Sequence, residues 1–161
     1  MMKCSDFIVK DAIVTDLQAT NKKEVLAELV QALVKSGRLN DSDSELVVEA
    51  LLKRESLGST GIGRGVAVPH TKLQCVDNMI GCVGISRDGV NFDALDSEDV
   101  KLFFLLISPP DRPGDHLRAL EHLTMHVKSD NFIHMLEQAT SADAVSEMLE
   151  TADSNDGGDE K

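Results

Sequence analysis

The stretch with the most chemical content is STGIGRGVAVPHTK, residues 59–72, in which three glycines precede a proline and a histidine. Glycine tolerates positive φ values and close backbone approach, whereas Pro69 fixes its own φ and restrains Val68 before it. His70 therefore follows a stiff segment. The reference pKa of histidine is about 6.5, so a neutral ring offers a nucleophilic nitrogen that can form a covalent intermediate.

Two nucleotide-binding patterns do not fit this stretch. The glycines form G-x-G-x-G rather than G-x-G-x-x-G, and a predicted helix precedes them. No Lys-Ser/Thr pair follows the last glycine, as a P-loop requires. On chemistry alone, the slightly favoured interpretation is an ordinary turn with His70 as a packing residue. The alternative is that the glycines remove side chains around a rigid, reactive imidazole.

The wider stretch RESLGSTGIGRGVAVPHTK, residues 54–72, closely resembles the phosphorylation-site region of the enzyme IIA domains of the bacterial phosphoenolpyruvate-dependent phosphotransferase system (PTS), of the fructose–mannitol and nitrogen-regulatory type. The similarity includes GVNFDALDSEDVKLFFLLISP and DHLRALEHL. It implies that His70 accepts a phosphoryl group from the phosphohistidine of an HPr-type phosphocarrier protein. His70 then passes the group to an enzyme IIB or holds it as a signal for a regulatory target protein. The resemblance thus implies a phosphotransferase without a cofactor.

The resemblance also implies supporting residues around His70. Arg54 matches the family arginine, and a guanidinium fork suits two oxygens of a phosphoryl dianion; from its position alone it is a solvated cation at a helix C-terminus. His116 matches the second family histidine. It lies in the first turn of a predicted helix, where the positive helix end favours an anion. Ser59 and Thr60 are candidate phosphate-binding residues through their hydroxyls, and shaping the turn is an equal alternative.

A second pair of histidines, His122 and His126, has the i, i+4 spacing of metal ligands on a helix. On a helical wheel these two lie opposite Leu117, Leu120 and Leu123, toward water, and no third ligand is evident. We therefore expect no metal site and no effect of Zn²⁺ or chelators. A metalloenzyme built on this pair is a distant alternative.

Composition excludes several function classes. The 161 residues carry a net charge of −12 and include no Trp or Tyr, which argues against binding to nucleic acid. The longest apolar run, residues 102–107, is too short to span a bilayer, and the N-terminus has no secretory signal. Three cysteines without a CxxC motif predict reduced thiols in a cytoplasmic protein. A docking partner is expected to carry positive charge.

Periodicity predicts the elements that must position these residues. Helical spacing of apolar residues predicts helices over residues 19–38, 41–55 and 116–127, and shorter ones over 131–139 and 141–150. Strands are expected over 66–69, 79–86 and 100–108, with a hairpin turn at Asp88 and Gly89. We predict an α/β fold with a central mixed β-sheet flanked by helices on both faces, as in mannitol-type IIA proteins. The domain is expected to span residues 1–151, before a disordered acidic tail over 152–161.

Three functions compete at this point. The first is a sugar-transport component that passes phosphate to a IIB. The second is a regulatory component of the nitrogen type, mildly favoured because the chain carries no fused IIB or membrane segment. The third is a catalytically silent IIA-like binding module that regulates partner proteins. The presence of Arg54, His70 and His116 together argues against the silent module.

Overall fold

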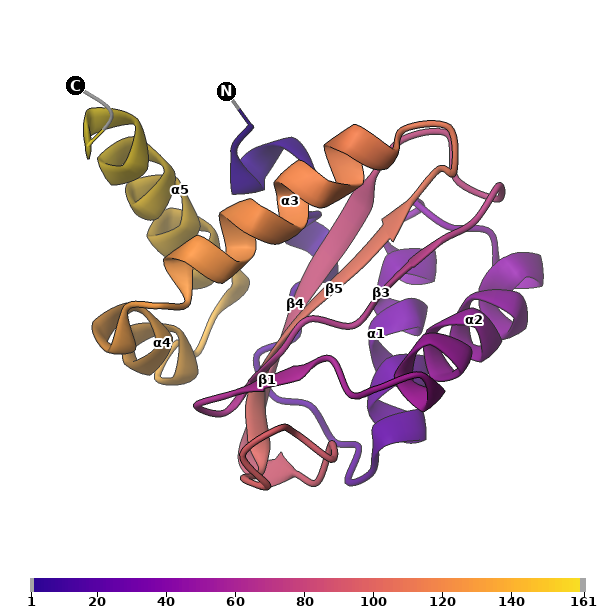
Figure 1. Cartoon of the computed structure of the whole chain (residues 1–161), viewed down its shortest axis with the longest axis horizontal. Helices are drawn as coiled ribbons and strands as arrows, with labels where there is room; N and C mark the ends of the chain where they lie inside the picture. The colour runs from indigo at the N-terminus through magenta and orange to yellow at the C-terminus, as the bar shows by residue number, and fades with distance from the viewer. Residues whose placement is uncertain (1, 160–161) are drawn as a thin grey trace.

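A computed structural model of the chain describes residues 2–159, with side chains up to residue 154. It contains one mixed sheet with helices on both faces, which confirms the predicted fold class (Figure 1). In chain order the elements are η1 (Cys4–Asp6), η2 (Lys10–Ala12), α1 (Lys22–Lys35), η3 (Asp41–Asp43), α2 (Ser44–Ser56), β1 (Gly61–Gly63), β2 (Val66–Ala67), β3 (His70–Lys72), β4 (Ile80–Val90), β5 (Val100–Ser108), α3 (Pro113–His126), α4 (Asp130–Glu137) and α5 (Ala142–Asp159).

The sheet is organised around β5, the most apolar strand. β4 runs antiparallel along one edge of β5, and β2 and β3 run parallel to it along the other. β1 pairs antiparallel with β2 at the outside. Because β2 and β3 follow one another along the same edge, His70 is paired with Leu106, near the C-terminal end of the central strand.

The two faces of the sheet contact different helices. Alternate residues of β5 point in opposite directions, as a strand requires: Phe103 and Leu105 pack in the core that includes residues of α1 and α2, whereas Phe104 and Leu106 pack in the core with α3, α4 and α5. Burying each of these side chains is worth about 1.5–3 kcal/mol, so both layers are firmly held on the strand.

The predicted hairpin turn at Asp88 and Gly89 is wrong. β4 continues through both residues to Val90, and its pairing with β5 shifts between Ile85 and Val90. Gly89 has φ +84°. A β-bulge and a tight hairpin turn both favour a glycine with positive φ. The dipeptide Asp88-Gly89 therefore does not by itself distinguish a bulge from a hairpin turn.

Helix α3 begins at Pro113, three residues earlier than predicted, with the proline in the first turn where its missing N–H costs nothing. Its buried residues include His116, Ala119 and His122, whereas Leu117 is 57% exposed. Leu123, on the predicted apolar face, is buried as expected, but the buried face is rotated away from Leu117 toward His122. This corrects the expectation that His122 faces water.

The C-terminal helix α5 runs on to Asp159, so the disordered tail does not begin at residue 152. Asp153 is 5% exposed, and its Oδ1 accepts a hydrogen bond of 3.0 Å from the backbone N–H of Cys4. The folded domain thus includes residues that composition assigned to the tail. The last two residues of the predicted tail, 160 and 161, lie outside the described part of the chain.

Candidate active site

His70 presents one defined nitrogen. Its ring is half-buried at the start of β3, and Nδ1 lies 2.7 Å from the carbonyl oxygen of Val68. A carbonyl can only accept, so Nδ1 must carry the proton, and the neutral ring keeps its lone pair on Nε2. Pro69 fixes the backbone between the two bonded residues, and its own carbonyl accepts from Leu106 N–H at 2.9 Å. The sheet therefore holds the imidazole in place with its lone pair on Nε2.

His116 brings a second imidazole to the same place. It lies in the first turn of α3 and is 5% exposed, and its ring centroid is 5.4 Å from that of His70. Its Nδ1 lies 2.5 Å from the hydroxyl oxygen of Ser108, the buried last residue of β5. The end of the central strand thus orients His116, as it also supports His70.

Both imidazoles are neutral at pH 7. Burial, together with the nearby charges of His70 and Lys72, lowers the pKa of His116 to about 4. Burial is also the main reason that the pKa of His70 is lowered, and the positive charges of Arg54 and Lys72 lower it as well. The hydrogen bond to the Val68 carbonyl and the charge of Glu55 act to raise it, but the net shift is downward. A neutral ring is the nucleophilic form of histidine, and the lowered pKa of His70 favours this form.

Arg54 supplies a cation near His70, as its influence on the His70 pKa shows. It is half-buried in the last turn of α2, and its Nη1 donates to the carbonyl of Gly58 at 2.8 Å. This bond fixes the guanidinium against the loop that leads into β1. The site therefore combines a nucleophilic nitrogen, a second neutral imidazole and a fixed cation, which is a set suited to a phosphoryl group.

The chain matches the family model for EIIA 2 of the phosphoenolpyruvate-dependent sugar phosphotransferase system over residues 6–152. The chain belongs to this family. No helix within residues 2–159 combines the length and the apolar character needed to cross a membrane.

Relatives of this EIIA chain fall into two groups. It is 34% identical over 152 residues to a fructose-specific EIIABC component of Bacillus subtilis, covering 94% of the chain but only 24% of that longer protein. It is 32% identical over 148 residues to a nitrogen regulatory protein of Bradyrhizobium diazoefficiens, covering 92% and 95%. The family thus includes both sugar-specific and regulatory proteins.

Solved structures of the EIIA family share the fold. Nitrogen regulatory protein IIA-Ntr of Neisseria meningitidis has a TM-score of 0.81 at 33% identity, covering 89% of this chain and 97% of that one. The mannitol IIA of Escherichia coli has a TM-score of 0.72 at 25% identity, covering 88% and 97%.

In this EIIA chain the hydroxyls of Ser59 and Thr60 make internal hydrogen bonds. Ser59 Oγ donates to the Phe92 carbonyl at 2.7 Å and accepts from Gly61 N–H at 3.0 Å. The Thr60 hydroxyl donates in a short contact to the carboxylate of Glu55. These bonds shape the loop; a role in binding phosphate stays a prediction.

Two of the glycines are required by close packing. A Cβ at Gly61 would lie 2.7 Å from Cβ of Ala94, and one at Gly63, where φ is +99°, would lie 3.3 Å from a carboxylate oxygen of Asp96. Both glycines therefore allow close packing of the β1 loop on the segment before β5.

Two further charged residues lie near the site, and neither was among the predicted site residues. Glu55 is buried, accepts from the Thr60 N–H at 3.1 Å, and lies 3.3 Å from Nζ of Lys22. Lys72 influences both imidazoles through its charge. The period of two along a strand places Lys72 on the same side as His70, so this signal was available. Nothing local in the sequence indicates that Glu55 turns inward.

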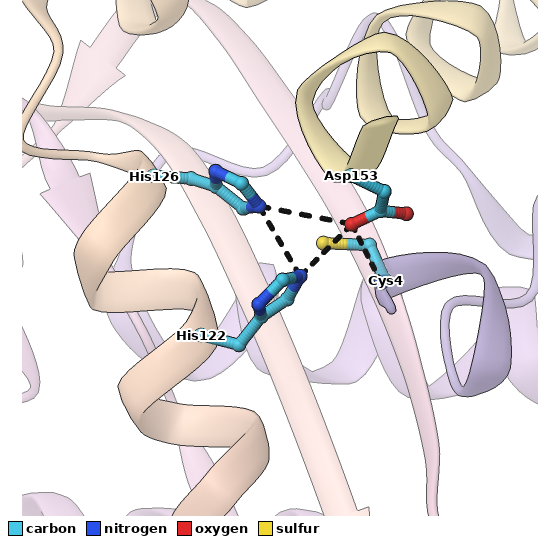
Figure 2. A group of neighbouring side chains, drawn as sticks. All are labelled: Cys4, His122, His126 and Asp153. Carbon is cyan, nitrogen blue, oxygen red and sulfur yellow. Dashed lines mark hydrogen bonds and ion pairs between the residues drawn. The ribbon is translucent and has the colours of Figure 1, made fainter. Parts of the chain in front are cut away.

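The pair His122 and His126 lies elsewhere on α3. Figure 2 shows it grouped with Cys4 and Asp153.

Proposed function

We propose that this protein is a phosphocarrier that accepts a phosphoryl group on Nε2 of His70 from the phosphohistidine of an HPr-type protein. The observation that carries the proposal is the 2.7 Å bond between Nδ1 of His70 and the carbonyl of Val68. It assigns the proton to Nδ1 and the lone pair to Nε2, in a ring that family resemblance identifies as the acceptor.

The transfer exchanges one P–N bond for another. The Nε2 lone pair of His70 attacks phosphorus, the bond between phosphorus and the donor nitrogen breaks, and its electron pair returns to the donor ring. No proton has to move, because Nδ1 keeps its proton through the bond to Val68. Catalysis then depends on positioning and on stabilising the charge of the transferred group.

Arg54 and His116 take the stabilising roles in this proposal. The guanidinium of Arg54 binds phosphoryl oxygens as a permanent cation. The Ser108 hydroxyl lies beside Nδ1 of His116. In this proposal it donates to Nδ1, so the single proton of the ring lies on Nε2 and is donated in a hydrogen bond to the same group. Ser59 and Thr60 contribute by holding the loop beside the site.

The partners follow from the family and from charge. The donor is an HPr-type phosphocarrier, and the net charge of −12 favours a positively charged docking face on it. The acceptor is an enzyme IIB. A second candidate function is regulation by the phosphorylation state, supported by the higher TM-score to IIA-Ntr, 0.81, than to the mannitol IIA, 0.72.

The test is phosphorylation by a reconstituted donor chain. The protein is incubated with phosphoenolpyruvate, enzyme I and HPr, and acid-labile phosphate is mapped by mass spectrometry. One phosphoryl group on His70 is expected, none in His70→Ala, and wild-type labelling in the exposed control His134→Ala. Labelling that persists in His70→Ala contradicts the proposal, as does an unlabelled wild type.

The same phosphorylated protein separates the two functions. Mixed with purified IIB domains, a carrier loses its label within seconds and the IIB gains it. A regulatory protein keeps its label in the presence of every IIB domain offered. Retained label therefore contradicts the transport role and supports the regulatory one.

A further inference from the structure

Four side chains with metal-binding atoms meet at a place that the proposed phosphoryl transfer does not use. They come from three elements: Cys4 from η1, His122 and His126 from α3, and Asp153 from α5. One ligand atom from each residue lies within 4.8 Å of the other three. In Figure 2 the sulfur, a nitrogen of each ring and a carboxylate oxygen converge on one small volume.

The measured distances are close to those of a tetrahedral site. Nε2 of His126 lies 3.2 Å from Nε2 of His122 and 3.7 Å from Oδ1 of Asp153. Ligands bound to zinc at about 2.0–2.3 Å in a tetrahedron are about 3.3–3.8 Å apart. Nε2 of His122 and Oδ1 of Asp153 are 2.8 Å apart. Zinc binding would require these two atoms to move apart by less than about 1 Å, which a small side-chain rotation provides.

We propose that this cluster is a structural Zn²⁺ site. Thiolate, imidazole and carboxylate are all ligands of zinc, and the i, i+4 histidines of a single helix turn are a common part of such sites. Four protein ligands fill a tetrahedral shell and leave no open position for chemistry. The charges of the thiolate and the carboxylate balance those of the ion.

Burial supplies a second, independent reason for a cation here. Asp153 is 5% exposed, and within the described residues its Oδ2 has no hydrogen-bond partner. A buried carboxylate is stable only when its charge is offset by hydrogen bonds or a cation. Zn²⁺ bound through Oδ1 offsets that charge directly.

An access route for the ion is present. His126 is the less buried histidine of the pair. It lines a pocket of about 610 Å³ between α3, α4 and α5, whose lining also includes Met125, Phe132 and Met148. A hydrated ion can reach His126 from this pocket and lose its water as the remaining ligands close around it. The ion would then join the N-terminal segment and α5 to α3.

The site is separate from the phosphoryl chemistry. His116 and His122 are six residues apart on α3, about 9 Å along the helix axis. Zinc therefore stabilises the helix that carries His116 without contacting the reacting atoms. The inference does not depend on the proposed function, and its test uses no phosphorylation assay.

The test is metal binding by the full chain, stripped with a chelator and then titrated with Zn²⁺ against a chromophoric competitor. We expect one Zn²⁺ per chain and a higher melting temperature. Co²⁺ in place of Zn²⁺ should give the thiolate-to-cobalt absorption band of a tetrahedral site, and Cys4→Ser should remove that band. His126→Gln should weaken zinc binding by at least about tenfold.

Matched controls separate this site from adventitious binding. His134→Gln and Cys75→Ser remove one histidine and one cysteine outside the cluster, and both should bind zinc as the wild type does. His126, with 10% of its side chain exposed, is the informative position if replacing the more deeply buried Cys4 or Asp153 prevents folding. Equal zinc affinity in the wild type and His126→Gln overturns the proposal, as does a melting temperature that Zn²⁺ leaves unchanged.

Discussion

The ring of His116 lies beside the ring of His70, with centroids 5.4 Å apart and planes inclined by 56°. The two histidines come from different elements, His70 from β3 and His116 from the first turn of α3. In the proposed transfer Nε2 of His70 is the nucleophile, and His116 donates to the phosphoryl group bound there. This arrangement makes the contributions of the two rings separable by experiment.

Arg54→Lys keeps the positive charge but removes the guanidinium fork. A charge-assisted hydrogen bond is worth about 1.5–3 kcal/mol, so phosphoryl transfer should slow about tenfold to a hundredfold. Single-turnover transfer from phospho-HPr measures this rate. Lys53→Arg, at an exposed position on the same helix, is the matched control and should transfer at the wild-type rate. A loss of less than twofold in Arg54→Lys would mean that the arginine is structural.

His116→Gln keeps a hydrogen-bond donor but removes the imidazole. Acceptance from HPr should continue, and onward transfer to a IIB domain should slow more than acceptance does. The two rates are measured separately by single-turnover experiments. If the substitution changes neither rate, His116 does not contact the phosphoryl group.

Lowering the pH should destabilise the protein through His116. The unfolded imidazole takes up a proton near pH 6.5, and the folded one, with its pKa lowered to about 4 by burial, does so only near pH 4. The unfolded chain therefore binds more protons in this window. Above pH 6.5 the neutral His116 makes its full contribution to the free energy of unfolding. As the pH drops from 6.5 to 4, the free energy of unfolding should fall by about 3 kcal/mol because of this residue. Urea unfolding at several pH values measures it.

The control for this pH effect is His116→Gln, which lacks the titrating group and should lose less stability between pH 6.5 and 4. His134→Gln should keep the wild-type slope, because His134 is exposed. Parallel curves for the wild type and His116→Gln would contradict the lowered pKa.

Glu55→Ala should destabilise the loop before β1. The substitution leaves the Thr60 N–H and hydroxyl without their acceptor and Lys22 without its buried partner. Unsatisfied buried groups cost about 1–3 kcal/mol, which urea unfolding can detect. Glu49→Ala, at an exposed position on the same helix, should change stability by less than about 0.5 kcal/mol. Equal effects of the two substitutions would rule out this role for Glu55.

Truncation after residue 151 should lower the melting temperature, because it removes the Asp153 carboxylate that accepts from Cys4 N–H and contacts His122. Truncation after residue 154 keeps that carboxylate and serves as the control. The rate of phosphoryl acceptance should be the same in both forms, since neither truncation reaches His70. Equal melting temperatures of the two truncated proteins would show that Asp153 contributes nothing to stability.

Local patterns in the sequence were sufficient for the fold class and for the position of His70. The apolar residues 100–108 predicted a buried central strand, and the glycines, Pro69 and His70 supported a family resemblance. Helix and strand periodicity are properties of neighbouring residues, so they can be recognised without tertiary information. A helix cap is also a local feature: at the start of α1, Asn21 Oδ1 accepts from the N–H of Glu24.

Only the tertiary structure decided which side of α3 is buried and what meets there. Leucines dominated the helical wheel, yet Leu117 is exposed and His122 is buried, because Cys4 and Asp153 supply polar partners from the two ends of the chain. The proton on Nδ1 of His70 likewise depends on where the Val68 carbonyl points. Contacts between residues far apart in the chain, and the orientation of single atoms, are set by how the elements pack, and no local pattern encodes them.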